Sequence, residues 1–192
     1  MKILVGLLLI VGGLALRVDA QGTVNFANGT STRVSHCAGV PMVASAGYRA
    51  ELVYAPDGTS LDQFEAVAVR VGADTAVGMP AVGLYSGGAR TAPTTTPGGF
   101  GLFQVRVWNL ASGPDWRAVR AFGRSTDFIG ESFIMRIDTG DPTTVPPGTP
   151  TPLVGNGLTS IVLGPVGCVP EPSVIALGVA GVGVLLVLRR RQ

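Results

Sequence analysis

The chain has 192 residues, of which 46% are hydrophobic, and its formal net charge of +2 arises from its two ends. The body between residues 21 and 167 has one more acidic residue than basic residues. Because this body is almost neutral and has no run of lysine or arginine, its composition gives no electrostatic support for nucleic-acid binding.

The first segment of the chain has the pattern of a secretory signal peptide. Lys2 precedes an uninterrupted apolar run over residues 3–16. Val18 and Ala20 are the small or aliphatic residues that a signal peptidase accepts before its cut. We therefore predict cleavage between Ala20 and Gln21. The alternative is an N-terminal membrane anchor, but the run is shorter than the ~20 residues of a spanning helix.

The body has the length of one domain, and its glycine and proline content favours turns over long helices. Short runs in it alternate between apolar and polar residues, which is the two-residue period of a half-buried strand. The candidate strands are TVNF, YRAELVY, FEAVAVRV, AVGLY, GLFQVRVW, SFIMRI and LTSIVL. Turn-forming residues separate them at Asn28-Gly29, Asp57-Gly58, Ser86-Gly87-Gly88 and Pro97-Gly98-Gly99. The pattern predicts a mainly β fold, namely a single antiparallel β-sandwich domain.

One segment of the body, GPDWRAVRAFGRS, has helical spacing instead. Asp115 is a suitable N-cap, Trp116, Val119 and Phe122 lie three residues apart, and Gly123 can end the helix. We predict one short helix that crosses the sandwich.

The expected organisation has five parts. Residues 1–20 are the signal peptide, and residues 21–138 form the β-sandwich body. Residues 139–152, rich in proline and threonine, are a loop or linker, because this composition favours extended chain over a packed core. The last strand of the body lies within residues 153–168, and residues 169–192 form a C-terminal tail.

Two cysteines, Cys37 and Cys168, remain after signal cleavage. In an oxidising compartment an even number of cysteines favours one disulfide, which would connect the start of the domain to its end. The alternatives are two free thiols, or the loss of Cys168 with the tail.

The single histidine, His36, is next to Cys37. Neighbouring side chains of an extended segment point to opposite faces, so this pair is a poor nucleophile and base. With one histidine and two distant cysteines, the chain lacks the paired ligands of a zinc site. We expect no catalytic residue, no metal site and no cofactor.

Carboxylates and tryptophans are the remaining candidates for carbohydrate chemistry. Glycoside cleavage needs two carboxylates across a sugar, and the nearest pairs in sequence are Asp62 with Glu65 and Asp127 with Glu131. Asp138 and Asp141 lack the alternating ligands of a calcium loop. Trp108 and Trp116 can form either a sugar-stacking platform or a buried contact between the strand and the short helix, and the buried contact is the more common arrangement.

The tail combines three elements in a fixed order. An apolar run over residues 174–188 reaches about 22 Å of a ~30 Å hydrocarbon layer, which is short for a permanent anchor. The terminal arginines place the C-terminus in the cytoplasm by the positive-inside rule. The elements on the two sides of this predicted transmembrane helix are Val169, Pro170, Glu171, Pro172 and Ser173 before it, and Arg189, Arg190 and Arg191 after it.

These residues resemble the PEP-CTERM sorting signal of Gram-negative bacteria. The resemblance covers about the last 24 residues and implies recognition by an exosortase, a membrane-embedded enzyme that cuts near the Pro-Glu-Pro element. The order of QGTVNFAN, YRAELVYAPDG, GLFQVRVWNLASG and a proline-rich stretch is also similar to that in PEP-CTERM proteins of the Verrucomicrobia, to which no activity is attached.

The resemblance implies an exported protein of the cell surface or extracellular matrix, in bacteria that often make exopolysaccharide. Its processing partners would be signal peptidase and exosortase, with a transient inner-membrane intermediate. The expected role is not enzymatic. Two alternatives are a secreted carbohydrate-active enzyme and an envelope protein that remains anchored by its tail.

Overall fold

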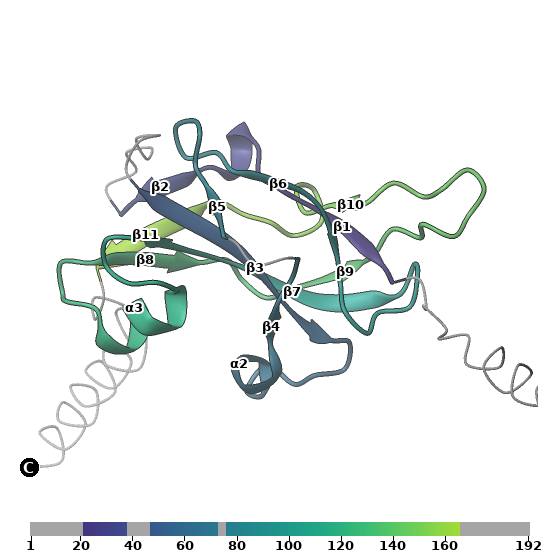
Figure 1. The fold of residues 1–192 in the computed structure, drawn as a ribbon, viewed down its shortest axis with the longest axis horizontal. Coiled ribbons are helices and arrows are strands. Elements are labelled where there is room, and N and C mark those ends of the chain that lie inside the picture. Colours follow the sequence, from purple (N-terminus) through teal and green to yellow (C-terminus); the bar gives the residue numbers. More distant parts are fainter. Residues whose placement is uncertain (1–20, 38–46, 73–75, 166–192) are drawn as a thin grey trace, which may run out of the picture.

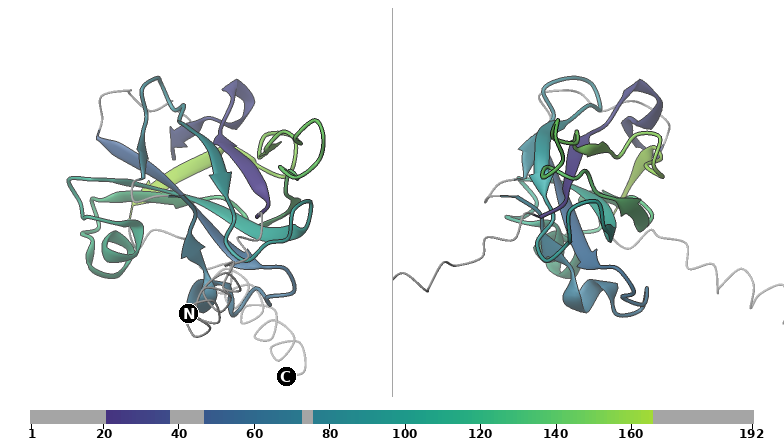
Figure 2. Two further views of the ribbon diagram at one scale, coloured as in Figure 1. Left: turned by 45° about the vertical axis from the view of Figure 1, so that its right-hand side comes forward. Right: turned by 90° about the vertical axis from the view of Figure 1, so that its right-hand side faces the viewer.

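A computed structural model describes residues 21–37, 47–72 and 76–165. The fold is mainly β, with two sheets and few helices (Figures 1 and 2). The elements in chain order are β1 (Thr23–Ala27), η1 (Thr30–Thr32), β2 (Val34–His36), β3 (Tyr48–Pro56), α2 (Phe64–Val67), β4 (Val69–Arg70), β5 (Val77–Gly78), β6 (Ser86–Thr91), β7 (Phe100–Asn109), α3 (Trp116–Phe122), β8 (Phe128–Glu131), β9 (Met135–Asp138), β10 (Thr151–Pro152) and β11 (Ile161–Pro165).

The larger sheet is built around the long antiparallel pair β3 and β7, which is in register from Tyr48 opposite Asn109 to Pro56 opposite Gly101. Its strand order is β2-β11-β8-β7-β3-β4, with β5 also paired to β3 and β9 to β7. The smaller sheet has the order β10-β1-β6. Most pairs are antiparallel, as predicted, but β1 with β10 and β2 with β11 are parallel.

The main core lies between the two sheets, and the predicted alternation in β3 and β7 places their apolar faces in it. β1 contributes Val24 and Phe26 from the smaller sheet. β3 and β7 contribute side chains that are at most 7% exposed, which are Tyr48, Ala50, Leu52, Tyr54, Phe103, Val105 and Val107. The inward faces of these strands were therefore predicted correctly.

The predicted short helix is present as α3. The Asp115 carboxylate accepts a hydrogen bond from the Ala118 amide at 2.8 Å, and Gly123 follows the last helical residue. This is the N-cap geometry expected from the sequence, because the side-chain oxygen satisfies an amide that has no partner within the helix.

Two strand predictions were wrong. In FEAVAVRV only Val69–Arg70 is a strand, and Phe64–Val67 forms α2. Phe64 and Ala68 are buried four residues apart, which is a helical spacing, and they pack in a second apolar cluster on the outer face of the large sheet. AVGLY has only an isolated bridge between Ala81 and Leu84.

The segment Ser86-Gly87-Gly88, predicted as a turn, lies in β6 and pairs with β1. The strand is irregular there, because the register with β1 shifts between Phe26 and Ala27. Residues in the range predicted as a loop or linker also contact the body: β10 pairs with β1, and Gly140 forms a bridge with Thr23. In the described part of the chain no helix has both the length and the apolar character needed to cross a membrane.

Candidate functional site

The outer face of the β3–β7 pair contains charged side chains that are buried. Glu51 of β3 lies directly opposite Arg106 of β7, and Arg106 lies opposite Glu131 of β8. Arg106 is only 1% exposed and Glu51 only 5% exposed. A buried charge is costly unless it is paired and hydrogen-bonded, so the arrangement around Arg106 has to compensate it.

Glu65 of α2 provides the ion pair for Arg106. The two carboxylate oxygens of Glu65 accept from the two terminal nitrogens of Arg106, and the Nε of Arg106 donates to the Gln104 amide oxygen at 2.9 Å. This fork geometry is the strong, bidentate form of an arginine–carboxylate pair. Burial nevertheless lowers the pKa of Arg106 from its ordinary value, although Glu65 and the neighbouring carboxylates act in the opposite direction.

The same Glu65 connects α2 to α3. The Nε of Arg117 donates to Glu65 at 3.0 Å, and its Nη2 donates to the backbone carbonyls of Glu65 and Ala68 at 2.9 and 3.2 Å. Glu65 belongs to α2, Arg106 to β7 and Arg117 to α3. The carboxylate of Glu65 therefore connects these three elements. Three hydrogen bonds thereby hold the guanidinium group of Arg117 beside α2, although its side chain is 55% exposed.

Trp116 lies under the arginines of this face. The guanidinium carbon of Arg106 is 4.4 Å from the ring centre of Trp116, and that of Arg120 is 4.9 Å from it. Both distances are in the range of a cation–π contact. Trp116 packs in turn on Trp108 and Val119 in a third apolar cluster. The short helix therefore covers Trp108, which was the expected buried arrangement.

The second ion pair of this face joins Glu51 to Arg70 of β4. Both Nε and Nη2 of Arg70 lie 2.6 Å from the same carboxylate oxygen of Glu51. β4 is held at the edge of the sheet by its pairing with Val53 and Tyr54 of β3.

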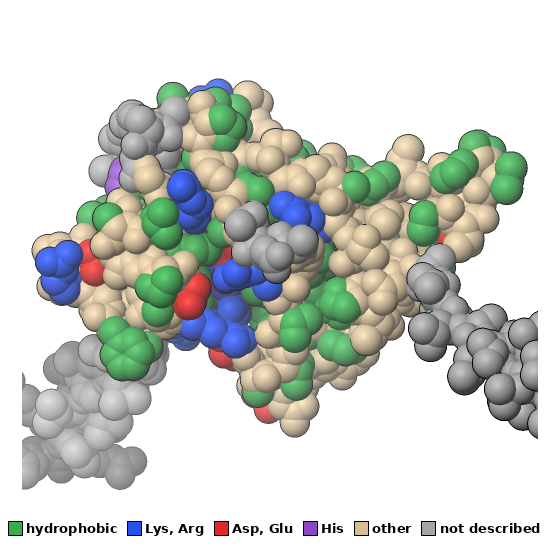
Figure 3. All heavy atoms as spheres, viewed as in Figure 1, with side chains coloured by type: hydrophobic (Ala, Val, Ile, Leu, Met, Phe, Trp, Pro, Cys, Tyr) green, Lys and Arg blue, Asp and Glu red, His purple; other side chains and the backbone are tan. Residues whose placement is uncertain are grey.

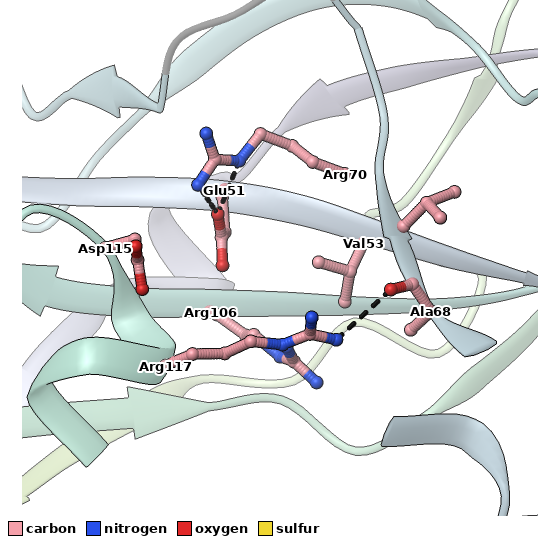
Figure 4. A pocket seen from close by; sticks show the side chains of 8 residues that line it. Glu51, Val53, Ala68, Arg70, Arg106, Asp115 and Arg117 are labelled. Carbon is pink, nitrogen blue, oxygen red and sulfur yellow. Dashed lines mark hydrogen bonds and ion pairs between the residues drawn. The ribbon is translucent and has the colours of Figure 1, made fainter. Parts of the chain in front are cut away.

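A cavity of about 380 Å³ opens between these groups (Figure 4). Its charged lining consists of Glu51, Arg70, Arg106, Asp115 and Arg117. Its apolar lining consists of Val53, Ala68 and Val69. Figure 3 shows basic side chains gathered near the middle of this face of the molecule. We call this cavity the arginine pocket.

The arginine pocket offers hydrogen-bond donors, carboxylate acceptors and an apolar wall, but no nucleophilic hydroxyl or thiol. In the described ranges no group of three or more His, Cys, Asp and Glu side chains is arranged to hold a metal ion. The arrangement is suited to holding a polar ligand by charge and hydrogen bonds.

The predicted sorting and processing residues lie mostly outside the described residues. This holds for Ala20, for Cys168, and for the complete tail with Val169, Pro170, Glu171, Pro172, Ser173, Arg189, Arg190, Arg191 and the apolar run 174–188. Gln21 is described and lies two residues before β1. The predicted cleavage, sorting and transmembrane helix remain predictions.

Cys37 is exposed and directly follows β2. Its amide donates to the carbonyl of Leu163 in β11 at 3.0 Å. His36 lies edge-on against the rings of Tyr48 and Phe128, with ring centres 6.0 and 5.0 Å away. The histidine is therefore part of an aromatic contact at the end of the sheet.

The candidate carboxylates are used in separate local contacts. Glu65 binds two arginines, and Asp127 accepts from the Arg124 amide at 2.7 Å. Asp141 accepts from the amide of Thr143 two residues later. Asp62 is hydrogen-bonded to Ser60, whereas Glu65 is ion-paired with Arg106 and Arg117, so these two carboxylates have different partners.

The arginine pocket was missed by the sequence analysis, because its arginines come from β4, β7 and α3 and are far apart along the chain. The sequence did contain an indication of this site, because Glu51 and Arg106 are charged residues near the middle of two otherwise mostly apolar strands. No family model, curated protein or solved structure matches this chain.

Proposed function

We propose that this protein is an exported component of the cell surface or extracellular matrix, sorted and cleaved by an exosortase and associated with exopolysaccharide. The observation that carries the proposal is the order of elements in the tail. A Pro-Glu-Pro motif at residues 170–172 precedes a short apolar run and a terminal arginine cluster.

The two ends of the sequence agree with each other. The pattern of the first 20 residues is that of a signal peptide, and the terminal arginines favour a cytoplasmic C-terminus. A signal peptide at the start and a cytoplasmic C-terminus both agree with a body on the outer side of the inner membrane. The apolar run of residues 174–188 is short for a stable anchor, which suits an intermediate that waits for cleavage.

The body in this proposal is one β-sandwich module that acts by binding. The mainly β fold with two packed sheets supports this architecture. The two acidic residues of the arginine pocket each have a structural partner, since Glu51 is ion-paired with Arg70 and Asp115 caps α3, which favours a binding role over carbohydrate cleavage.

Intact mass measured on the protein from its native host, with and without the exosortase gene, tests the proposal. We expect a product that starts at Gln21 and lacks residues 174–192 when the enzyme is present, and a membrane-bound, tailed product when it is absent. A species that keeps its tail in the presence of the enzyme would contradict the sorting proposal and support a permanent anchor.

Two variants sharpen this experiment. Replacing Pro170 and Pro172 together by alanine removes the motif but keeps the apolar run, so the tail should be retained. Pro147→Ala is the matched control, because Pro147 is an exposed proline of the loop before β10. Its product should be cleaved normally.

A further inference from the structure

We infer that the arginine pocket binds a sugar acid, meaning a sugar unit whose ring carries a carboxylate. The inference deepens the proposed function and rests on it in one respect, because an exopolysaccharide is the source of the sugar. The proposed function names exopolysaccharide but no binding site, and the arginine pocket is that site in this inference.

The basic lining of the pocket suits the carboxylate. Arg70 and Arg117 supply planar forks of donors, which match a carboxylate better than a lysine ammonium does, whereas the buried Arg106 is already paired with Glu65 and Gln104. Arg70 and Arg117 are partly exposed at the pocket. In each of them the Nη1 group donates to no described residue, and the inference assigns this group to the ligand.

The acidic lining suits the hydroxyl groups of a sugar. Glu51 binds Arg70 through one oxygen, and Asp115 caps α3 through one oxygen. The second oxygen of each carboxylate accepts no hydrogen bond from the described residues. A simple anion would gain nothing from these acceptors and would be repelled by them. A ligand that carries both a carboxylate and hydroxyls can use both halves of the lining.

The remaining wall and the size of the pocket fit one sugar ring. Val53, Ala68 and Val69 provide an apolar surface for the C–H groups of the ring. The volume of about 380 Å³ lies at the lower end of the ~300–1,000 Å³ that small-molecule sites occupy. Stacking on tryptophan is not part of this binding, because Trp116 is 1% exposed.

Several side chains of the pocket have protein partners before a ligand arrives. Arg106 is fixed by Glu65, Gln104 and the ring of Trp116, and Arg117 is fixed by Glu65 and a backbone carbonyl. Groups that are already held in position lose less conformational entropy on binding. This favours measurable affinity for a small polar ligand.

The test uses the full-length chain, purified in a detergent whose headgroup contains no sugar. Sodium D-glucuronate, D-glucose and sodium acetate are titrated separately, and binding is followed by ligand-observed NMR. We expect glucuronate to bind at least about tenfold more tightly than glucose, which lacks the carboxylate, and than acetate, which lacks the hydroxyls. Equal affinity for glucuronate and either of the other probes would overturn the inference, as would no binding of glucuronate.

Variants connect the binding to the pocket. Arg117→Gln should weaken glucuronate binding at least about tenfold, and Arg117→Lys should recover part of it, because lysine keeps the charge but not the fork. Arg136→Gln is the matched control: Arg136 is 53% exposed against 55% for Arg117, it is also paired with a carboxylate, and it lies outside the pocket. An equal loss in both glutamine variants would overturn the inference.

The two proposals fail separately. A chain that keeps its tail beside the exosortase but binds glucuronate through Arg117 overturns the sorting proposal and leaves the pocket assignment in place. A chain that is cleaved normally but binds no glucuronate overturns the pocket assignment alone.

Discussion

The central guanidinium carbon of Arg106 lies over the ring of Trp116, 4.4 Å from its centre. On the other sides Arg106 is held by Glu65 and Gln104. A charged side chain that is almost completely buried thus has an ion-pair partner, an amide acceptor and an aromatic face as direct neighbours. It is the point at which β7, α2 and α3 meet.

Removing Arg106 should therefore be costly. We expect Arg106→Ala to lower the free energy of unfolding by about 2–4 kcal/mol, because it leaves the amide oxygen of the buried Gln104 without its donor and opens a cavity beside Trp116. Arg136→Ala removes an exposed pair with Asp57 and should cost about 0–1 kcal/mol. Urea unfolding followed by circular dichroism measures both, and similar costs would show that Arg106 has no special structural role.

A second prediction concerns Asn28 at the end of β1. Its amide donates to the carbonyls of Thr32 and Gly83 at 2.9 Å each, and its oxygen accepts from the Tyr85 amide at 2.8 Å. Asn28→Ala loses all three bonds and should lower the free energy of unfolding by about 2–3 kcal/mol. Asn156→Ala, which loses one exposed bond to Pro152, should cost less than about 1 kcal/mol. Thermal unfolding of the two variants side by side distinguishes them.

Gly83 should tolerate no side chain. Its φ is +65°, and a Cβ built there would lie 2.3 Å from the backbone oxygen of Val34. Gly88 has a similar φ of +69° but nothing within 4 Å of such a Cβ. Gly88→Ala should cost about 1–2 kcal/mol from the backbone conformation alone, and Gly83→Ala clearly more, because backbone atoms must also move. Equal unfolding midpoints of the two variants in denaturant would contradict the close approach of Gly83 to the Val34 backbone.

The pH dependence of stability at the acid end should involve Asp127. The Arg124 amide, which donates to its carboxylate at 2.7 Å, is the main reason that the pKa of Asp127 lies below its ordinary value of 3.8. The unfolded chain takes up this proton first as the pH falls. The stabilisation is therefore complete above about pH 4 and is lost as the pH falls through the lower pKa of the folded state.

Carboxyl-carbon NMR titration should show this lowered pKa directly. Arg124→Ala should keep most of the shift, since the backbone amide remains, whereas Asp127→Asn should make stability depend less on pH below about 4. Loss of the whole shift in Arg124→Ala would show that the side-chain charge is the cause.

One of the two cysteines of the predicted disulfide, Cys37, lies in the described part of the structure. Cys37 follows β2, which pairs in parallel with β11, and β11 ends at Pro165, three residues before Cys168 in the sequence. We expect the oxidised protein to contain no free thiol by alkylation and mass measurement. Its reduction should lower the free energy of unfolding by about 2–5 kcal/mol. Two alkylated cysteines without prior reduction would contradict the pairing.

Local patterns predicted those parts of the fold that depend on local physics. The alternation in β3 and β7 correctly identified the residues of the core, and Asp115 with Gly123 correctly bounded α3. The same alternation failed for Phe64–Val67, where burying Phe64 on the outer face of the sheet favours a turn of helix. An alternating pattern over eight residues does not distinguish a strand from a short helix when the surface that the segment packs against is unknown.

Strand partners and the arginine pocket depend on contacts between distant segments. The runs TVNF and LTSIVL did not predict the parallel pairing of β1 with β10 and of β11 with β2. The direction of strand pairing is set by the topology of the whole domain. The polar faces of the predicted half-buried strands were expected to face solvent, and Glu51 and Arg106 lie on these faces. Both side chains are buried because α2 and α3 cover that face. A contact between the short helix and Trp108 was predicted, but Phe64–Val67 was predicted as a strand, so its cover over this face was not.

The parallel pairs also determine the order in which the domain can form. The first two strands of the chain, β1 and β2, pair with the last two, β10 and β11, so the earliest segment to be synthesised cannot complete its sheet until the latest one has emerged. Contacts between such distant segments are slow to form, because a long loop must close first. We therefore expect both sheets to be completed only after residues 151–165 are available for pairing.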